Sequence, residues 1–185
     1  MLKNRNKTLP RAIEANKTTK RNWANETAIV VFCFGLGLLI WSSILFDRTM
    51  IHPLAVWITI LFPGLPMVFM FRRPINNIAK KKIHFMLHYT FHACTTGSVI
   101  AFAILATNFY LSSANTSRKS VEILEFGSRN GGKGSSKRTP YALIKYKDLE
   151  KAYFLTEFEV KYTKNRDEMT IETKSGFFGF DVIEK

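Results

Sequence analysis

Three long intervals of this 185-residue sequence contain no Asp, Glu, Lys or Arg, namely residues 27–46, 49–71 and 83–117. Each interval is long enough to cross about 30 Å of hydrocarbon as a helix that rises about 1.5 Å per residue. A soluble fold with 22% charged residues would very rarely leave three such gaps. The sequence therefore excludes an ordinary soluble domain, although its mean hydropathy is only −0.03. The 14% of aromatic residues argue against disorder.

The first interval predicts one transmembrane helix over about residues 28–46. A cleaved signal peptide is the competing interpretation, but its apolar region is shorter and is followed by small residues. Here the apolar run ends in Ile44, Leu45 and Phe46. We therefore expect an anchor that is not cleaved.

The second interval predicts a span over about residues 53–71 that is interrupted in its middle. It contains Pro53, Pro63, Gly64 and Pro66, and proline removes a backbone donor from the helical hydrogen-bond ladder. A kinked spanning helix is the first interpretation, and a re-entrant loop is the alternative.

The third interval is longer than a bilayer requires. Pro74 suits the first position of a helix, so we expect one long helix that begins there on the membrane surface and crosses the bilayer over about residues 85–111. Ala93, Gly97 and Ala101 recur every four residues. Small residues at this spacing let helix backbones approach closely, so this face is predicted to pack on another helix.

Positive charge predicts the orientation of the spans. Seven Lys and Arg residues lie in residues 1–26 and five in residues 72–82, whereas the first loop carries only Arg48. Positive loops stay in the cytoplasm, so we expect residues 1–26 to form a basic cytoplasmic tail in a bacterial inner membrane, with the first loop and the C-terminal region in the periplasm. The two inner segments supply ten of the 13 excess positive charges, which points to anionic lipid headgroups and not to nucleic acid as the partner.

Residues 118–185 predict an extracytoplasmic domain of antiparallel strands. Alternating or β-branched runs place strands at residues 121–126, 141–147, 151–162, 168–174 and 177–183. In the third run, Ala152, Phe154 and Phe158 alternate with polar residues and are expected to face the core. The predicted fold class is thus an α+β membrane protein, in which three transmembrane helices within residues 27–112 precede a small antiparallel β-sheet domain. So small a domain, with no cysteine of its own, is expected to need support from the membrane, an oligomer or another protein.

His84, His88 and His92 are spaced by four residues and share one face of the third helix. Imidazoles in this arrangement could hold a metal ion, ligate haem or relay protons. The competing interpretation is a polar face turned toward the interior of the helix bundle. No acidic residue lies in any span to orient a ligand, so we expect no resident cofactor.

Two glycine-containing motifs in the C-terminal domain resemble functional loops. Residues 127–134 approach the phosphate-binding pattern, but Gly134 replaces the hydroxyl residue that would hold Mg²⁺, and a strand follows, so we expect a hairpin loop. Residues 177–180 read Phe-Phe-Gly-Phe. Because Phe178, Phe180 and Val182 alternate, strand core is the first interpretation, and an exposed aromatic contact motif is the alternative.

The predicted function is that of a non-enzymatic multi-pass membrane protein whose β domain binds a protein partner or a like subunit. The C-terminal domain contains no His and no Cys, so nucleophilic catalysis has no support. The alternative is a small transport or redox subunit that uses the histidine face with metal or haem, together with the proline kink at Pro63 and Pro66.

Overall fold

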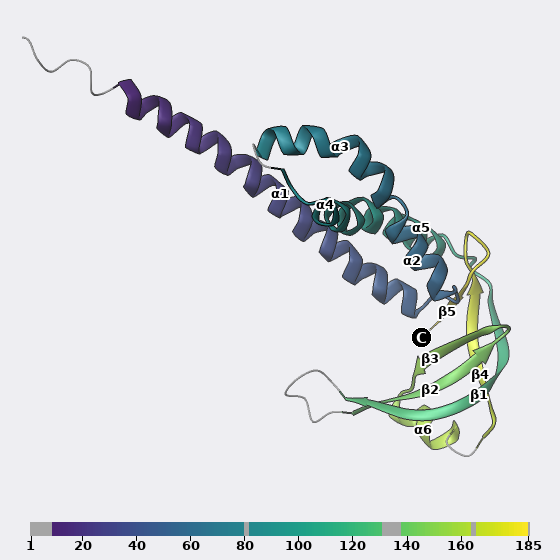
Figure 1. Ribbon diagram of the computed structural model, residues 1–185. Coiled ribbons are helices and arrows are strands. Elements are labelled where there is room, and N and C mark those ends of the chain that lie inside the picture. Colours follow the sequence, from purple (N-terminus) through teal and green to yellow (C-terminus); the bar gives the residue numbers. More distant parts are fainter. Residues whose placement is uncertain (1–8, 80–81, 131–137, 164–165, 185) are drawn as a thin grey trace, which may run out of the picture. The chain divides into compact units, whose positions relative to one another are not determined.

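The computed structural model describes residues 9–79, 82–130, 138–163 and 166–184. As predicted, the fold is α+β, with three long apolar helical stretches followed by a curled, five-stranded antiparallel sheet (Figure 1). The elements are α1 (Leu9–Asp47), α2 (Pro53–Leu61), α3 (Gly64–Ala79), α4 (Phe85–His92), the π-helical stretch η1 (Ala93–Gly97), α5 (Ser98–Tyr110), β1 (Thr116–Asn130), β2 (Arg138–Tyr146), β3 (Leu149–Phe154), α6 (Glu157–Thr163), β4 (Glu168–Ser175) and β5 (Asp181–Ile183).

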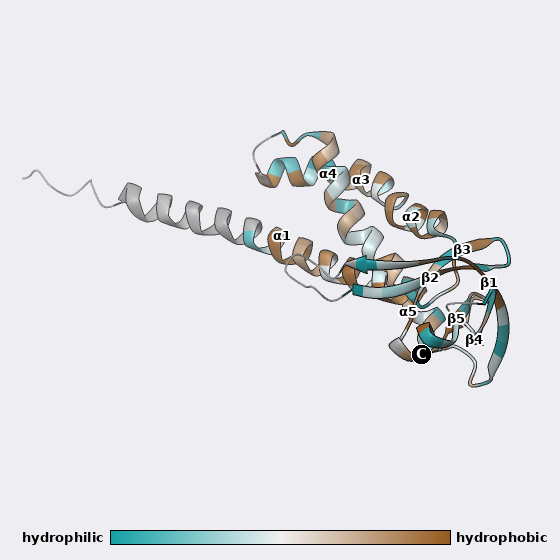
Figure 2. Ribbon diagram, turned by 90° about the horizontal axis from the view of Figure 1, so that it is seen from below, coloured by the Kyte–Doolittle hydropathy of each residue, from teal (hydrophilic) through white to brown (hydrophobic). Residues whose placement is uncertain are grey.

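Three helical stretches are long and apolar enough to cross a membrane. They are Glu26–Asp47, Pro53–Ala79 and Phe85–Tyr110, with lengths of 22, 27 and 26 residues. Figure 2 shows hydrophobic residues along α2 and along the C-terminal part of α1. The three candidate spans contain the segments predicted from the charge-free intervals.

The end of the second candidate span and the start of the third differ from the prediction. The helix of the second span is interrupted at residues 62–63, between α2 and α3, which confirms the predicted break. The prediction that Pro74 starts the third helix is wrong, because α3 continues through Pro74 to Ala79. The third helix instead starts at Phe85, where the His84 side chain accepts a hydrogen bond from the Met86 backbone N–H and caps the new N-terminus.

The chain divides into two compact units. One comprises the chain up to Ser42 together with Val56–Ala103, and the other comprises Ser43–Ala55 together with the chain from Ile104 onward. The second unit therefore contains the β domain, the loop between the first two spans and the helix ends that flank this loop.

Small residues allow close helix packing in the first unit, as predicted. A Cβ atom on Gly97 would collide with the backbone of Ile60 in α2, and one on Gly64 would meet the backbone of Ala93 at 3.2 Å. Ala93 and Ala101 are 5% and 2% exposed. The small-residue face is thus used for packing inside this chain.

The five strands are arranged in the order β3-β2-β1-β4-β5, and all pairings are antiparallel. The 15-residue strand β1 pairs with β4 through its first half and with β2 through its second half, and Glu122 pairs with both. A bulge at Leu124 shifts the register between β1 and β2. Bulges bend and twist a strand, which contributes to the curl of the sheet.

The curled sheet encloses a hydrophobic core that includes a residue from outside the β domain. Its buried members are Met50, Val121, Ala142, Ile144, Tyr146, Tyr153, Leu155, Met169, Ile171 and Ile183. Met50 comes from the loop between α1 and α2, and this loop also pairs with β5 through the bridge between Thr49 and Val182. The small domain therefore receives support from another segment of its own chain.

The prediction of one strand over residues 151–162 is wrong in two respects. The strand is shorter than predicted, and its opposite face is the buried one. Strand β3 ends at Phe154, and α6 follows. Lys151 and Tyr153 are buried, whereas Ala152 is exposed. The physical reason is a capping box, in which the Thr156 hydroxyl accepts from the Glu159 N–H at 3.3 Å and the Glu159 carboxylate accepts from the Thr156 N–H at 2.7 Å. This local pairing starts a helix where alternation predicted a strand.

Replacement of Gly97 by alanine tests the close packing of the helices. The added methyl group meets the Ile60 backbone, so we expect Gly97→Ala to lower the free energy of unfolding by about 1–3 kcal/mol. Gly37→Ala is the matched control, because its Cβ would have no atom within 4 Å and helix propensity changes in the same direction. The measurement is thermal unfolding in mild detergent, and equal melting temperatures for the two variants would contradict the packing.

Candidate functional site

The predicted histidine face does not form a three-residue site. His84 is exposed and its Nδ1 atom caps α4, at 3.3 Å from the Met86 nitrogen. His88 and His92 are buried, and their ring centroids are 6.4 Å apart. Within the described part of the chain, no three His, Cys, Asp or Glu side chains are arranged to hold a metal ion. His84 is thus separated in role from the buried pair His88 and His92.

Asn76 is a partner of the histidine face that the sequence pattern did not reveal. Its Oδ1 atom lies 3.2 Å from the Nε2 atom of His88 and accepts a hydrogen bond from the Ile83 backbone at 3.0 Å. One amide therefore joins α3, the segment before α4 and the histidine face. The Nε2 atom of His92 is buried and has no hydrogen-bond partner among the described residues.

The loop that resembles a phosphate-binding motif lies mostly outside the described residues. Its beginning, residues 127–130, belongs to β1 and pairs with β2. Gly127 lies opposite Tyr141, and a Cβ atom there would collide with the Tyr141 ring. The glycine thus makes room for a cross-strand aromatic ring, while residues 131–137 lie outside the described part.

The aromatic segment of residues 177–180 is a turn, so its interpretation as strand core is wrong. Only residues 181–183 of the predicted strand belong to β5. Phe177, Phe178 and Phe180 are 60%, 49% and 37% exposed. Gly179 has a φ of 83°, a left-handed conformation that glycine adopts without strain and that breaks the strand. The alternative interpretation, an exposed aromatic motif, agrees with this structure.

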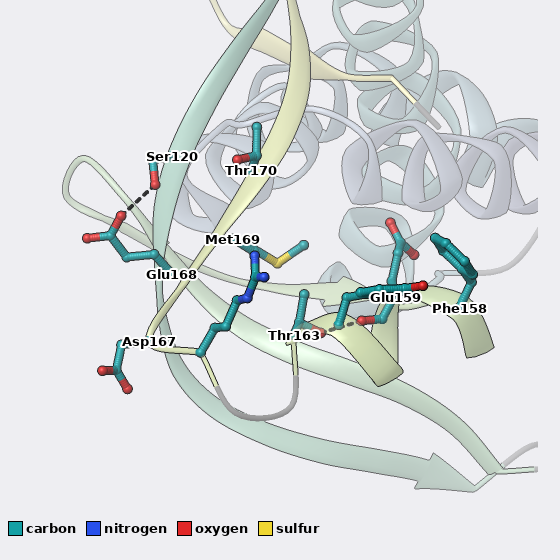
Figure 3. A pocket seen from close by; sticks show the side chains of 10 residues that line it. Ser120, Phe158, Glu159, Thr163, Asp167, Glu168, Met169 and Thr170 are labelled. Atoms are coloured by element: carbon teal, nitrogen blue, oxygen red, sulfur yellow. Dashed lines mark hydrogen bonds between the residues drawn. The ribbon is translucent and has the colours of Figure 1, made fainter.

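Helix α6 and strand β4 line an open pocket of about 730 Å³ in the β domain (Figure 3). Its lining residues are Ser120, Phe158, Glu159, Tyr162, Thr163, Arg166, Asp167, Glu168, Met169 and Thr170. Phe158 and Tyr162 lie one helical turn apart, are 68% and 58% exposed and have ring centroids 4.6 Å apart. The pocket thus has a pair of solvent-exposed aromatic rings in its wall.

Glu159 holds the helical wall of this pocket in place. Besides its role in the capping box, its carboxylate accepts a hydrogen bond from the hydroxyl of Tyr153 in β3 at 3.1 Å. Burial and the neighbouring Glu159 carboxylate raise the pKa of Tyr153 to about 12, so the phenol stays protonated and continues to donate. The sequence Thr156-Glu157-Phe158-Glu159 carried the capping-box signal from which α6 could have been predicted.

Lys151 connects β3 to the end of the first span. Its Nζ atom donates to the Phe46 carbonyl and, at 2.5 Å, to the Thr49 carbonyl, and it lies 4.4 Å from the centre of the Phe46 ring. The side chain thereby satisfies carbonyls at the C-terminus of α1, where a positive charge interacts favourably with the helix dipole. Burial lowers the pKa of Lys151 to about 8, although the Asp47 carboxylate opposes this shift.

A second polar cluster fixes the start of β5. The Tyr146 hydroxyl donates to the Asp181 carboxylate at 2.5 Å, and Lys119 donates to both groups at 2.6 and 3.0 Å. Burial opposes ionisation of Asp181, but the hydrogen bonds from Tyr146 and Lys119 hold its pKa below the usual value. Because its members satisfy one another, this cluster is a structural tie between β1, β2 and β5.

Comparison with protein-family models, with curated proteins and with solved structures finds no match to this chain. What these surfaces bind is therefore inferred from the geometry of this chain alone.

The pH dependence of stability tests the buried position of Lys151. The folded pKa of about 8 lies below the ordinary value of 10.5, so the folded protein loses this proton before the unfolded chain does. The contribution of Lys151 to the free energy of unfolding should therefore rise between pH 8 and pH 10.5 and be lost as the pH falls through 8.

The measurement compares thermal unfolding of the wild type, Lys151→Met and Lys145→Met in detergent at several pH values. The melting temperature of the wild type should rise relative to that of Lys151→Met across this range. Lys145→Met, which changes an exposed lysine of β2, should follow the wild type. Parallel curves for the wild type and Lys151→Met would contradict the buried charge.

Proposed function

We propose that this protein is a non-enzymatic multi-pass membrane protein whose β domain binds a protein partner or a second copy of the chain through the wall of the α6 pocket. The observation that carries the proposal is the exposed pair Phe158 and Tyr162 beside a pocket of about 730 Å³. Aromatic residues and arginine are enriched at the centres of protein interfaces, and Arg166 lines the same pocket.

Rigid presentation of the aromatic pair supports this proposal. Glu159 caps α6 and bonds Tyr153 of β3, and Thr163 donates to the Glu159 carbonyl at 2.7 Å. A surface that is ordered before binding loses less entropy on association than a mobile one. The small-residue face of the third helix, in contrast, packs within the chain and does not support the partner proposal.

The proposed location is a bacterial inner membrane, with residues 1–26 in the cytoplasm and the β domain in the periplasm. The pairing of Thr49 and Val182 supports a common side for the first loop and the β domain, as three membrane crossings would require. The excess of Lys and Arg in residues 1–26 and 72–82 supports the cytoplasmic assignment of the opposite side.

Photocrosslinking in native membranes tests the partner surface. A benzophenone amino acid at position 158 should give a discrete adduct, whereas the same probe in place of Leu124, which is 41% exposed on β1, should give little. An adduct of twice the 21.3 kDa chain mass would identify a second copy as the occupant. The double variant Phe158→Ser and Tyr162→Ser should reduce recovery of the partner at least fivefold, and Leu124→Ser should not. Recovery of monomer alone from position 158 would refute the proposal.

Reporter fusions test the orientation. Alkaline phosphatase fused after Asp47 or Lys185 should be active, and green fluorescent protein fused after Ile78 should fluoresce, because the first two positions are expected in the periplasm and the third in the cytoplasm. Opposite signals at all three positions would invert the orientation. A cytoplasmic signal at Lys185 alone would show that one span has been miscounted.

A further inference from the structure

The turn of residues 176–180, between β4 and β5, presents phenylalanine rings from a fixed backbone. The Gly176 N–H donates to the Phe180 carbonyl at 3.1 Å, and the Gly179 N–H donates to the Gly176 carbonyl at 2.9 Å. The rings of Phe177 and Phe178 contact each other edge to face, with centroids 5.1 Å apart. We call this segment the aromatic turn.

Asn108 of α5 fastens the aromatic turn to the third candidate span. Its side-chain Nδ2 donates to the Phe180 carbonyl and its Oδ1 accepts from the Phe178 N–H, both at 3.0 Å. Its own carbonyl accepts from the Phe177 N–H at 3.4 Å. Asn108 is only 1% exposed. Asn108 thus bonds the turn at three points, two through its buried side-chain amide and one through its backbone carbonyl.

This attachment fixes the position of the aromatic turn relative to the end of the third candidate span. Asn108 lies two residues before Tyr110, the last residue of the span, which corresponds to about 3 Å of helix. Immediately after the turn, the Asp181 carbonyl accepts from the Met50 N–H at 2.7 Å, and Met50 lies in the short loop between the first two spans. The turn is therefore held between the end of the third candidate span and the loop that joins the first two candidate spans.

The exposed groups at this level have the chemistry of a membrane interface. The three phenylalanines of the turn are 37–60% exposed, and Tyr110 and Leu111 at the end of α5 are 61% and 60% exposed. Tyrosine and tryptophan gather at headgroup level because they combine an apolar ring with a polar end. Phenylalanine and leucine bury their apolar side chains at the boundary between headgroups and acyl chains. The continuity of the turn with the end of a spanning helix identifies lipid as its occupant.

We propose that the aromatic turn is a lipid-binding anchor, whose phenylalanine rings insert between headgroups at the membrane boundary, and that Asn108 is the positioning residue that sets their depth. This inference does not depend on the pocket of α6 or on which side of the membrane the domain occupies. It assigns the turn a lipid surface, whereas the α6 pocket is assigned a protein.

Fluorescence quenching of the full chain in vesicles tests this anchor. Cys33 and Cys94 are the only cysteines, so Cys33→Ala with Cys94→Ala provides a background for Phe178→Cys or the control Phe158→Cys. Each variant is labelled with an environment-sensitive nitrobenzoxadiazole dye in phosphatidylcholine and phosphatidylglycerol vesicles at a low protein-to-lipid ratio. Nitroxide lipids should quench the label at 178 at least fivefold more than the label at 158, and aqueous iodide should show the reverse order.

Asn108→Ala in the Phe178→Cys background tests the positioning role. Loss of both side-chain hydrogen bonds should reduce lipid quenching at 178 at least twofold and increase iodide quenching. Unchanged lipid quenching in Asn108→Ala would overturn the role of Asn108. Equal iodide access at 178 and 158 in the parent background would overturn the anchor itself. A label at 178 that neither quencher reaches would also overturn it, because a protein surface would then cover the turn.

Discussion

The pairing of the first interhelical loop with β5 is the interaction on which the β domain depends. The Met50 N–H donates to the Asp181 carbonyl at 2.7 Å, and the Ile183 N–H donates to the Arg48 carbonyl at 2.8 Å. This loop thereby covers a sheet edge that would otherwise expose unpaired backbone groups. It also supplies Met50 to the core. The sheet is thus completed by a segment that precedes β5 by more than 100 residues.

Two polar side chains make further long-range connections within the same unit. Lys151 reaches from the sheet to carbonyls at the end of α1, and Asn108 reaches from α5 to the aromatic turn. Both satisfy backbone groups where helices or turns leave carbonyls and N–H groups without regular partners. Because both side chains are buried, removing either one would leave its hydrogen-bond partners unpaired where water does not easily reach them. A lysine and an asparagine at such positions are therefore explained by local hydrogen-bond demand and need no catalytic role.

The sequence predicted the features that depend on composition over long windows. Charge-free intervals identified the spans, because a membrane excludes charge from about 20 consecutive residues. The spacing of Ala93, Gly97 and Ala101 identified a packing face, because only small side chains permit the close backbone approach. Alternation identified β4 for a similar reason, since Met169, Ile171 and Thr173 on one face of this strand are buried.

The errors arose where specific hydrogen bonds or a special backbone conformation outweigh a periodic pattern. The Thr156 and Glu159 capping box replaces a strand by α6, and the left-handed Gly179 converts a predicted core strand into a turn. The buried Lys151 reverses the expected face of β3, because the target of its ammonium group is an α1 carbonyl more than 100 residues earlier in the chain. The pattern of residues within a strand does not reveal a partner so far away in the sequence. The contacts of Asn76 and Asn108 were missed for the same reason, since a single amide in an apolar segment does not reveal which distant backbone it will bind.

The two exposed aromatic groups of the β domain differ in what holds them, and this difference explains why they are assigned to different environments. Phe158 and Tyr162 belong to α6, which Glu159 ties to β3, so their position is set by the sheet. Phe178 belongs to a turn that Asn108 ties to the end of the third candidate span, so its position is set by that helix end. Exposure alone would not separate these residues, because all three side chains are about half exposed or more. The proposed environments follow from these attachments, since a ring bonded to the end of a candidate span cannot move away from that end without breaking the bonds that hold it.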